Sequence, residues 1–322
     1  MNILIVKLSS LGDVVHAMPA VQDILAAHPG ARIDWVVERG FAPLVQRCRG
    51  VRRAIPCELR SWRKSPLAGA TRIGWRAFRE DLQREAYDAV IDLQGLTKSA
   101  LLARMARLAP GGKRYAMANR TEGSSYEAPT RWLADVAVPV EPHSHAVQRG
   151  RELCARVLGY VAEGAPRFGL QGADAQARGE TVALIHGTSR DDKCWPEAHW
   201  VALAWRLVDA GYRVGLPHGN EVERQRSEKL QQIVGERAEV WPRLSLDALT
   251  ERMAHCAGAI GVDSGLSHIA VALDLPHVQI YNFDTAWRTG PAEGGRQRSV
   301  FATPTPDVDA VWQAWQAVTI AR

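Results

Sequence analysis

The sequence contains few cysteines and no long apolar run. Its five cysteines are scattered and never form a C-x-x-C pair, so neither a disulfide framework nor a zinc site is indicated. No apolar run approaches the roughly 18–20 residues that span a bilayer. The N-terminus also lacks the charged, apolar and cleavage regions of a signal peptide. These absences predict a cytoplasmic protein whose thiols are reduced.

Two common nucleotide-binding fingerprints are missing as well. No G-x-G-x-x-G follows a predicted strand, and there is no G-x-x-x-x-G-K-[ST] loop, so neither a standard dinucleotide site nor a P-loop is expected. Asp191 and Asp192 are adjacent and stand beside Lys193, unlike the spaced pair of the D-x-D motif that binds a metal with a sugar nucleotide. These motifs therefore predict no metal site.

Positive charge is abundant and unevenly distributed. The 322 residues carry a net charge of +5, with 46% hydrophobic and 23% charged residues, which is typical of a soluble globular protein with room for two domains. Between Arg47 and Arg79 ten basic residues stand against one acid, Glu58. Such a patch fits nucleic acid, an anionic membrane surface or a phosphorylated substrate, or it is a solvated basic face. No helix-turn-helix, zinc-finger or RNP pattern occurs, so we expect no nucleic-acid partner.

Strand-like runs alternate with helical patterns in both halves of the chain. Alternation of this kind is typical of βαβ units and a parallel sheet. The predicted strands are 3–7, 33–37, 89–92, 181–186, 212–216, 258–262 and 277–281, and the predicted helices are 19–27, 75–84, 97–107, 196–210, 221–235 and 265–273. The pattern predicts an α/β protein with two doubly wound, Rossmann-like domains.

The domain boundaries follow from where the alternation stops. It weakens before residue 181, in a stretch rich in Gly, Ala, Gln and Asp. We therefore expect a first domain over 1–165, a linker over 166–180 and a second domain over 181–305. Apolar residues at helical spacing predict a terminal helix within 306–322, and we expect this helix to pack back on the first domain.

The opening of the chain reads as a strand, a tight turn and a helix. The apolar run from Ile3 to Val6 stops at Ser9-Ser10-Leu11-Gly12-Asp13, and a helical pattern follows. Ligands in open α/β sheets lie at the carboxyl ends of strands, and helix N-termini favour anions. A carboxylate at this place repels phosphate and suits a reacting hydroxyl, so Asp13 is a candidate general base. The alternative is that Asp13 caps the helix.

Three predicted strands of the second half each end in a polar cluster. After the first, Thr188, Ser189 and Lys193 are suited to a diphosphate, because hydroxyls donate hydrogen bonds and the ammonium neutralises leaving-group charge. After the second, either Glu221 or Glu223 is suited to a ribose diol, although both are also ordinary residues for a helix start.

The third cluster is Asp263-Ser264-Gly265-Leu266-Ser267-His268. Gly265 permits close approach of a ligand, and the amides of the new helix suit phosphate. Asp263 is either a cap or an acceptor from sugar hydroxyls. His268 is either a structural histidine or a ligand contact, and its neighbours favour the contact.

These motifs resemble a known enzyme family. The strings ILIVKLSSLGDVVHAMPA and VDSGLSHIAVALDLP resemble the ADP-heptose lipopolysaccharide heptosyltransferases, inverting transferases of glycosyltransferase family 9 with the two-domain GT-B fold. The stretches IDWVVERGFAPL, LRSWRKSP, YDAVIDLQGLTKSALL, HAVQRGRELCARVLGY and TSRDDKCWPEAHW are similar to the members that add the first heptose of the inner core. The resemblance spans about residues 2–281.

The resemblance implies a role for each matching residue. Asp13 would be the base that deprotonates the acceptor hydroxyl. The donor, ADP-L-glycero-D-manno-heptose, would be held by Thr188, Ser189, Lys193, Glu223, Leu244, Asp263, Ser264, Gly265, Leu266 and His268. The acceptor, Kdo-lipid A, would be held by Ser10, Gly12, Arg60, Arg63, Lys64 and Arg120. No metal or other cofactor is implied, and a lipid acceptor implies peripheral association with the anionic inner-membrane surface.

Two positions depart from the family pattern. After Tyr281 the family commonly continues Gly-Pro-Thr, whereas this chain has Asn282-Phe283-Asp284, and His218 stands where an aromatic residue is expected. Three alternatives stay open: a transferase with a different core acceptor or nucleotide sugar, a nucleotide-sugar epimerase of GT-B shape, and a noncatalytic ADP-heptose-binding protein. An epimerase has no use for the basic patch, and a binding protein has no use for Asp13.

Overall fold

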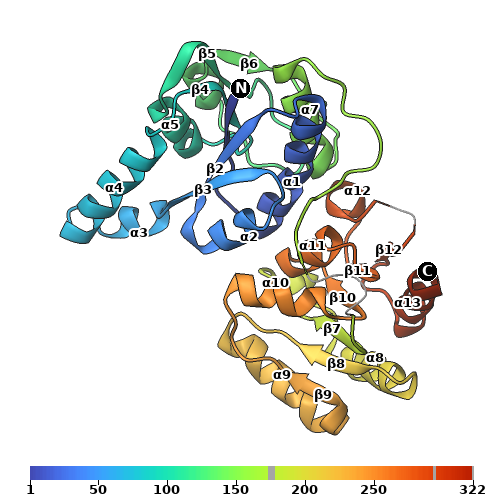
Figure 1. Cartoon of the computed structure of the whole chain (residues 1–322). Coiled ribbons are helices and arrows are strands. Elements are labelled where there is room, and N and C mark those ends of the chain that lie inside the picture. Colours follow the sequence, from blue (N-terminus) through green and yellow to red (C-terminus); the bar gives the residue numbers. More distant parts are fainter. Residues whose placement is uncertain (173–177, 293–294, 321–322) are drawn as a thin grey trace. The chain divides into compact units, whose positions relative to one another are not determined.

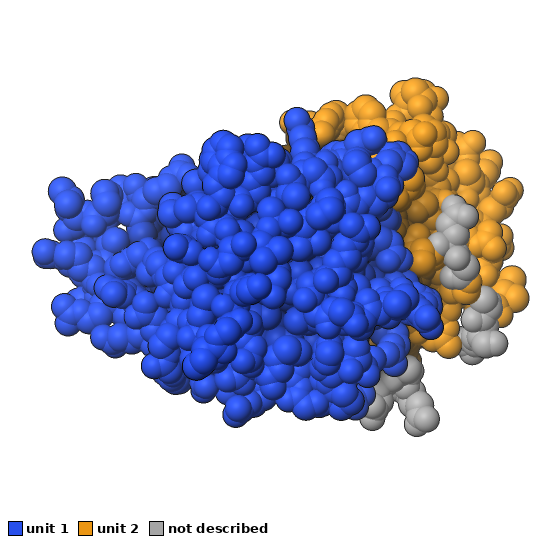
Figure 2. Space-filling view, turned by 90° about the horizontal axis from the view of Figure 1, so that it is seen from above, with its two compact units in different colours: residues 1–170 blue, residues 171–322 orange. Residues whose placement is uncertain are grey.

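The chain divides into two compact units. The computed structural model describes residues 1–172, 178–292 and 295–320. Unit 1 comprises residues 1–170 and unit 2 residues 171–322, drawn in blue and orange in Figure 2. The division falls inside the segment 166–180 that was predicted as a linker, of which residues 173–177 lie outside the described residues.

Unit 1 is built on a six-stranded parallel sheet with the order β3-β2-β1-β4-β5-β6 (Figure 1). The strands are β1 (Asn2–Val6), β2 (Arg32–Glu38), β3 (Val51–Cys57), β4 (Tyr87–Asp92), β5 (Leu108–Met117) and β6 (Val136–Val138). Strand β1 is a nearly continuous apolar run and β4 is buried at all but one residue, because helices cover both faces of such a sheet. Their carboxyl ends are neighbours, and the strand order reverses between them, which is where ligands bind in doubly wound folds.

The longer helices of unit 1 flank this sheet. The helices are α1 (Leu11–Ala27), α2 (Ala42–Gln46), α3 (Leu59–Lys64), α4 (Gly69–Leu82), α5 (Thr97–Met105), α6 (Pro129–Leu133) and α7 (Ala146–Leu158). Helices α1 and α7 pack together and are joined by a buried ion pair in which Arg151 Nε lies 2.6 Å from Asp23 Oδ2. This pair fixes the helix that begins at the β1 loop.

Unit 2 repeats the same topology. Its sheet has the order β12-β11-β10-β7-β8-β9, again parallel. The strands are β7 (Thr181–Ile185), β8 (Arg213–Leu216), β9 (Ala238–Val240), β10 (Gly258–Val262), β11 (His277–Tyr281) and β12 (Gln297–Phe301). The helices are α8 (Glu197–Asp209), α9 (Glu221–Val234), α10 (Leu246–Ala254), α11 (Gly265–Ala272), α12 (Ala286–Thr289) and α13 (Val308–Ile320). The predicted α/β class with two doubly wound domains is confirmed.

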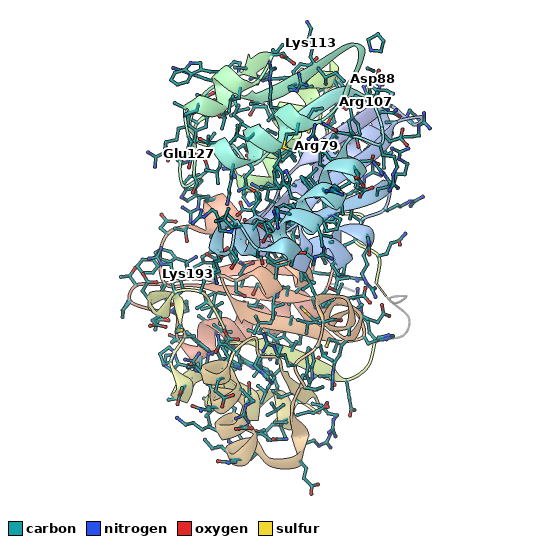
Figure 3. The ribbon with its side chains drawn as sticks, turned by 90° about the vertical axis from the view of Figure 1, so that its left-hand side faces the viewer. Arg79, Asp88, Arg107, Lys113, Glu127 and Lys193 are labelled. Carbon is teal, nitrogen blue, oxygen red and sulfur yellow. The ribbon has the colours of Figure 1, made fainter. Side chains whose placement is uncertain are left out.

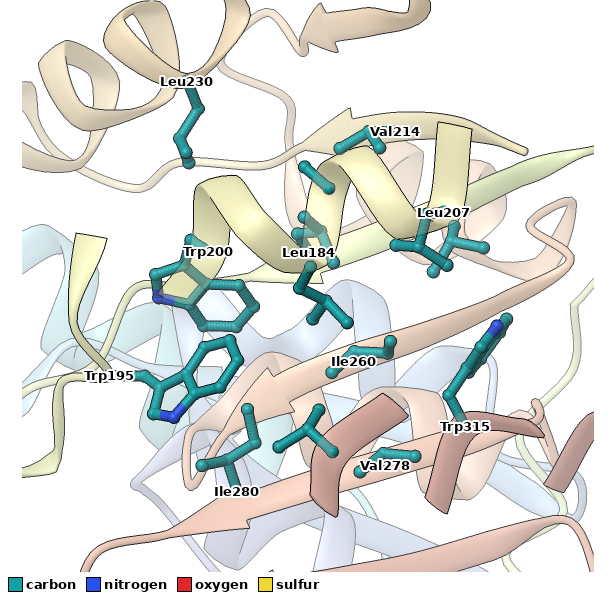
Figure 4. Close-up of a cluster of buried hydrophobic side chains, with 14 of the residues drawn as sticks. Leu184, Trp195, Trp200, Leu207, Val214, Leu230, Ile260, Val278, Ile280 and Trp315 are labelled. Atoms are coloured by element: carbon teal, nitrogen blue, oxygen red, sulfur yellow. The ribbon is translucent and has the colours of Figure 1, made fainter. Parts of the chain in front are cut away.

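The terminal helix α13 packs within unit 2. Its buried face, which includes Trp315, belongs to the core of unit 2 (Figure 4) and contacts α8, β11 and β12. Gly258, the first residue of β10, leaves room for this packing, because a Cβ there would lie 2.6 Å from the Trp315 ring. The missing side chain therefore creates the space that Trp315 fills.

Part of the predicted basic patch is also structural. Arg52 and Arg53 lie on β3, where both pair with the fully buried carboxylate of Asp34 at 2.8 and 2.7 Å. Burial raises the pKa of Asp34, but hydrogen bonds from both guanidiniums and from Tyr87 outweigh it and leave that pKa lowered. These two arginines are therefore committed to the fold, and six cations of the patch lie further along the chain, between residues 60 and 79.

Candidate functional site

The loop between β1 and α1 holds Asp13 in a defined position. Ser10 precedes the helix, and its backbone N–H and its hydroxyl donate to Asp13 Oδ2 over 3.0 and 2.8 Å. The carboxylate therefore does cap the helix start, as the alternative interpretation held. Its second oxygen, Oδ1, is free of these bonds and lies 3.4 Å from Lys7 Nζ. Since the Asp13 side chain is 37% exposed, capping still leaves the carboxylate accessible.

Lys7 is a buried cation at the end of β1. Its Nζ also donates to the carbonyl of Leu93 over 3.1 Å, which orients the ammonium towards Asp13. Burial lowers the pKa of Lys7, although Asp13 opposes this shift. Burial alone would raise the pKa of Asp13, but Lys7 and the Ser10 hydrogen bonds outweigh it and hold that pKa below its ordinary value. Asp13 therefore stays ionised at neutral pH.

The loop after β4 supports the loop after β1. Gln94 Oε1 accepts from the backbone N–H groups of Leu8 and Ser9 over 2.9 and 3.1 Å. Asp92 is buried and accepts from Gln94 N–H and Ser99 Oγ. Burial raises the pKa of Asp92 to about 6. The Gln94 amide thus fixes the turn that presents Asp13.

A small pocket adjoins these residues within unit 1. Its polar lining consists of Lys7, Asp13, His16 and Arg149. Arg149 comes from α7 and is anchored by a 3.0 Å hydrogen bond to Thr121 Oγ1. Two cations therefore flank the Asp13 carboxylate, which favours an anionic group beside the hydroxyl that this carboxylate would deprotonate.

The predicted acceptor residues follow different strands of this sheet. Ser10 and Gly12 belong to the Asp13 loop, whereas Arg60, Arg63 and Lys64 lie on α3, after β3. Arg120 follows β5. The four basic residues are exposed. Because the strand order is β3-β2-β1-β4-β5, α3 and Arg120 lie on opposite sides of the β1 loop along the carboxyl edge of the sheet.

Asp263 is the centre of the polar cluster in unit 2. It follows β10, and its Oδ2 lies 2.5 Å from Lys193 Nζ (Figure 3 labels Lys193). Its Oδ1 lies 3.5 Å from His268 Nε2 and accepts from Gln279 Nε2 over 3.4 Å. Burial raises the pKa of Asp263, but His268 and Lys193 outweigh it, so the pKa is lowered. A charged carboxylate thus holds the lysine at the strand ends.

The first and third predicted clusters meet between β7 and β10. Thr188 Oγ1 donates to the carbonyl of Asp263 over 3.3 Å, and Ser189 is exposed on the same loop. Ser264 precedes α11, and its buried hydroxyl is unpartnered among the described residues. The amides of Gly265 and Leu266 belong to the first turn, which has no intrahelical acceptors for them. Hydroxyls, amides and one ammonium here suit a diphosphate.

The second cluster lies beside the first. Glu223 accepts from Gly219 N–H over 2.7 Å and from Asn220 Nδ2 over 2.9 Å, so it helps to close the start of α9. A Cβ at Gly187 would lie 2.5 Å from its carboxylate carbon, which places Glu223 against the β7 loop. Leu244 is partly buried in the loop before α10.

The divergent residue Asn282 has a structural function. Its Nδ2 donates to the carbonyls of Asp192 and Cys194 over 3.0 and 2.9 Å, on either side of Lys193. Its Oδ1 accepts from Thr305 Oγ1 over 2.7 Å. Asn282 therefore braces the turn that carries Lys193. His218, the other divergent residue, is partly buried after β8.

Several residues of these sites were not predicted from the sequence. They are Lys7, Gln94, Arg149, Gln279 and Asn282. A charge at the end of an apolar strand was a usable signal for Lys7, and one amide inside the apolar run HVQIY was a signal for Gln279. The partners of Gln94 and Arg149 are 85 and 28 residues away in the chain, so spacing gives no signal for them.

Two kinds of feature are absent from residues 1–172, 178–292 and 295–320. None of the helices within them is long and apolar enough to cross a membrane. Within the same ranges, no group of three or more His, Cys, Asp and Glu side chains is arranged to hold a metal ion.

Two Rossmann-type units, each with polar residues at the carboxyl ends of its strands, are the architecture of the GT-B class of glycosyltransferases. The family model for glycosyltransferase family 9 (heptosyltransferase) matches residues 75–308. Lipopolysaccharide heptosyltransferase 1 of Escherichia coli K12 is 40% identical over 295 residues, covering 87% of this chain and 88% of that protein.

Solved structures agree with this match. The E. coli heptosyltransferase WaaC with ADP superposes with a TM-score of 0.88 at 35% identity and covers 99% of this chain and 100% of that one. The same enzyme with ADP-2-deoxy-2-fluoro heptose gives a TM-score of 0.84 at 35% identity, covering 98% and 99%. The chain belongs to glycosyltransferase family 9, the heptosyltransferases, and is an enzyme of that class.

Proposed function

We propose that the protein transfers L-glycero-D-manno-heptose from ADP-heptose to a Kdo hydroxyl of Kdo-lipid A. The observation that carries this proposal is the Asp13 carboxylate, which is ionised and accessible at the switch point of unit 1, where it can take the proton of an acceptor hydroxyl. The 40% identity of the chain with a lipopolysaccharide heptosyltransferase 1 supports Kdo-lipid A as the proposed acceptor. The neighbour with a bound ADP-heptose analogue supports the donor.

Unit 2 holds the donor in this proposal. Thr188, Ser189, Ser264 and the α11 amides bind the diphosphate, and Lys193 neutralises the charge that develops as ADP leaves. Glu223 binds the ribose hydroxyls, and Leu244 packs on adenine. Asp263 and His268 lie beside Lys193 and accept from or donate to sugar hydroxyls. Side chains and amides thus meet the leaving-group charge, so the proposed step requires no metal.

Unit 1 supplies the base and binds the acceptor. Ser10 and Gly12 shape the loop, and Arg60, Arg63, Lys64 and Arg120 pair with the carboxylates and phosphates of Kdo-lipid A. Asp13 takes the proton of the acceptor hydroxyl as its oxygen bonds to the anomeric carbon. The bond from that carbon to the diphosphate oxygen breaks, ADP departs with the electron pair, and the configuration inverts.

One assay tests the reaction and its alternatives together. Release of ADP from ADP-heptose is measured without acceptor, with Kdo-lipid A, and with a core that already carries the first heptose. We expect release only with Kdo-lipid A. Preference for the heptosylated core would identify a different transferase, acceptor-independent release or isomerisation would indicate an epimerase, and binding without release would indicate a noncatalytic protein.

A lipid acceptor also places the reaction at a membrane surface. We propose that the protein is cytoplasmic and associates peripherally with the anionic inner membrane, since exposed basic residues near anionic lipid each contribute about 1 kcal/mol. Such binding is reversible and weakens as salt rises.

Replacing Lys7 by methionine is expected to shift the pH dependence of transfer. Without its nearest cation Asp13 keeps its burial, so its pKa rises and the acidic limb of the kcat/KM profile moves to higher pH. At neutral pH we expect only a several-fold loss, because the base itself remains. His16, Asp92 and Arg149, the other charged or titratable groups near this pair, are unchanged in the variant.

Lys98→Met is the matched control for this measurement, since Lys98 is exposed on α5 of the same unit. Its profile should coincide with that of the unchanged protein. Coincident acidic limbs for Lys7→Met and the unchanged protein would show that Lys7 does not position or ionise the base.

Replacing Asn282 by alanine is expected to slow transfer. The turn around Lys193 loses two hydrogen bonds to its carbonyls, so the ammonium is less well positioned to meet the leaving-group charge. We expect kcat to fall about 5- to 20-fold, the equivalent of one or two such bonds, with a smaller change in KM for ADP-heptose. Asp284→Ala, two residues further along the chain, serves as the control, and equal kcat values for the two variants would refute the role of Asn282.

A further inference from the structure

Helices α3 and α4 form an exposed hairpin in unit 1, which we call the α3–α4 hairpin (residues 59–82). In Figure 1 it extends away from the sheet of its own unit. Between residues 60 and 77 only Trp62 is buried. Most of this segment therefore faces solvent.

Aromatic side chains on the inner face of the hairpin hold its two helices together. Trp62 of α3 packs against Trp75 and Phe78 of α4, with ring centroids 5.3 and 5.6 Å apart. Gly74 leaves space for the indole, because a Cβ there would lie 3.2 Å from Trp62 Nε1. These contacts hold the two helices together, and they leave the opposite face of α4 without a packing role.

Two large apolar side chains on the outer surface are unexplained by packing. Leu67, in the connection between the helices, is 89% exposed, and Ile73 on α4 is 73% exposed. Ile73 stands next to Arg72 and one turn before Arg76, so an apolar side chain lies within a row of cations. Apolar residues flanked by cations on an exposed helix are typical of elements that lie in a membrane interface.

The charge of the hairpin has one sign. From residue 59 to residue 79 the sequence contains six cations and no acid, and Arg79 at the far end of the row is labelled in Figure 3. Arg52 and Arg53 of the preceding strand are paired with acids. A surface with cations and exposed apolar side chains complements anionic headgroups above hydrocarbon.

We propose that the α3–α4 hairpin docks on an anionic lipid bilayer, with Leu67 and Ile73 inserted among the headgroups and Arg72, Arg76 and Arg79 against the lipid phosphates. This inference rests on the proposed function in one respect, because a lipid-linked acceptor would lie in such a bilayer. Docking through this element would place the basic residues of α3 at the membrane surface, where the acceptor headgroup lies.

The test is sedimentation of the full chain with vesicles that contain no lipid A. Phosphatidylcholine with phosphatidylglycerol at about 3:1 is compared with phosphatidylcholine alone, at low and high salt. We expect binding to the mixed vesicles. In Leu67→Ser/Ile73→Ser we expect at least about tenfold weaker binding, because insertion of both side chains is lost. In Arg72→Gln/Arg76→Gln the salt-sensitive part of the binding should fall.

Val161→Ser/Ile233→Ser is the matched control, since these side chains are 78% and 52% exposed and lie outside the hairpin. Its vesicle binding should equal that of the unchanged protein, and thermal unfolding should show that all variants fold. Equal binding by the hairpin variant and the control, or no binding by the unchanged protein to mixed vesicles at low salt, would overturn the proposal.

A second measurement separates this proposal from the proposed function. Transfer to a Kdo-containing acceptor fragment without acyl chains requires no membrane, so Leu67→Ser/Ile73→Ser should keep full activity with it. If the unchanged protein has no activity with either this fragment or Kdo-lipid A, the proposed function is wrong. Vesicle binding by the hairpin variant and its control would still test the proposed docking. If the variant loses activity with the fragment, the two side chains belong to the acceptor site and docking is refuted.

Discussion

Asp13→Asn is expected to reduce heptose transfer by about 10²- to 10⁴-fold, the range that a general base contributes. Asparagine accepts a hydrogen bond from Ser10 through its carbonyl oxygen, so the start of α1 keeps its cap, but the amide cannot take the acceptor proton. Binding of ADP should be unchanged, because the donor residues all belong to unit 2. The measurement is single-turnover transfer together with calorimetric titration of ADP.

The same helix offers a control with the opposite result. Asp23→Asn breaks the buried pair with Arg151, which is expected to cost roughly 3–5 kcal/mol of folding free energy and to leave transfer per folded molecule unchanged. Asp13→Asn should show the reverse. If Asp13→Asn instead lowers the unfolding temperature as much as Asp23→Asn and keeps transfer, Asp13 is only a cap.

The regular parts of the fold were predictable from local pattern. Strands such as β1 and β10 are continuous apolar runs, because both of their faces are buried, and their helices follow at once. The missed strands lack this signal. Strand β3 reads VRRAIPC, with two arginines whose partner Asp34 is distant in sequence, and β5 contains Pro110-Gly111-Gly112, which reads as a turn. Strands β6 and β9 have three residues each, too few for any period.

The packing of the terminal helix within unit 2 was not predictable from its own sequence. Its apolar spacing predicts a buried face, but spacing does not say which surface buries it. Within unit 2 one requirement is Gly258, because a Cβ at this position, 57 residues before Trp315, would collide with the indole.

The clustering of polar side chains at strand ends in unit 2 was predictable from the sequence. Thr188, Lys193, Asp263 and His268 come together in unit 2 as their positions after β7 and β10 imply. The supporting residues were not predictable. Gln94 acts through its contact with the neighbouring loop, and Asn282 braces Lys193 from 89 residues away, so both depend on the order of strands in the sheet rather than on spacing.

The sequence posed a choice between cap and base for Asp13, and the structure shows that the two are compatible. Oδ2 accepts both Ser10 hydrogen bonds, which fixes the carboxylate, and Oδ1 faces Lys7. Capping therefore orients the proposed base, and the lysine keeps it charged. This arrangement lowers the pKa of Asp13, so transfer should persist at pH values where an ordinary exposed aspartate begins to protonate.

Lys193→Ala is expected to lower kcat by about 10²- to 10³-fold, as removal of one preorganised group that meets developing charge does. The ammonium interacts most strongly with the diphosphate when the bond to the sugar breaks, so KM for ADP-heptose should change much less than kcat. Asp263 pairs with Lys193 before the donor binds, so its carboxylate also holds the ammonium in place. Asp263→Asn should therefore lower kcat by a smaller factor.

The combination of these two changes decides whether Lys193 and Asp263 act as a unit. If the carboxylate acts chiefly by positioning the lysine, Lys193→Ala/Asp263→Asn should be no slower than Lys193→Ala, because the second change has nothing left to displace. Lys229→Ala, on the exposed face of α9, controls for the loss of one positive charge in unit 2. Additive losses would mean that Asp263 contacts the sugar independently, and a Lys193→Ala rate within about threefold of the unchanged protein would remove Lys193 from the leaving-group site.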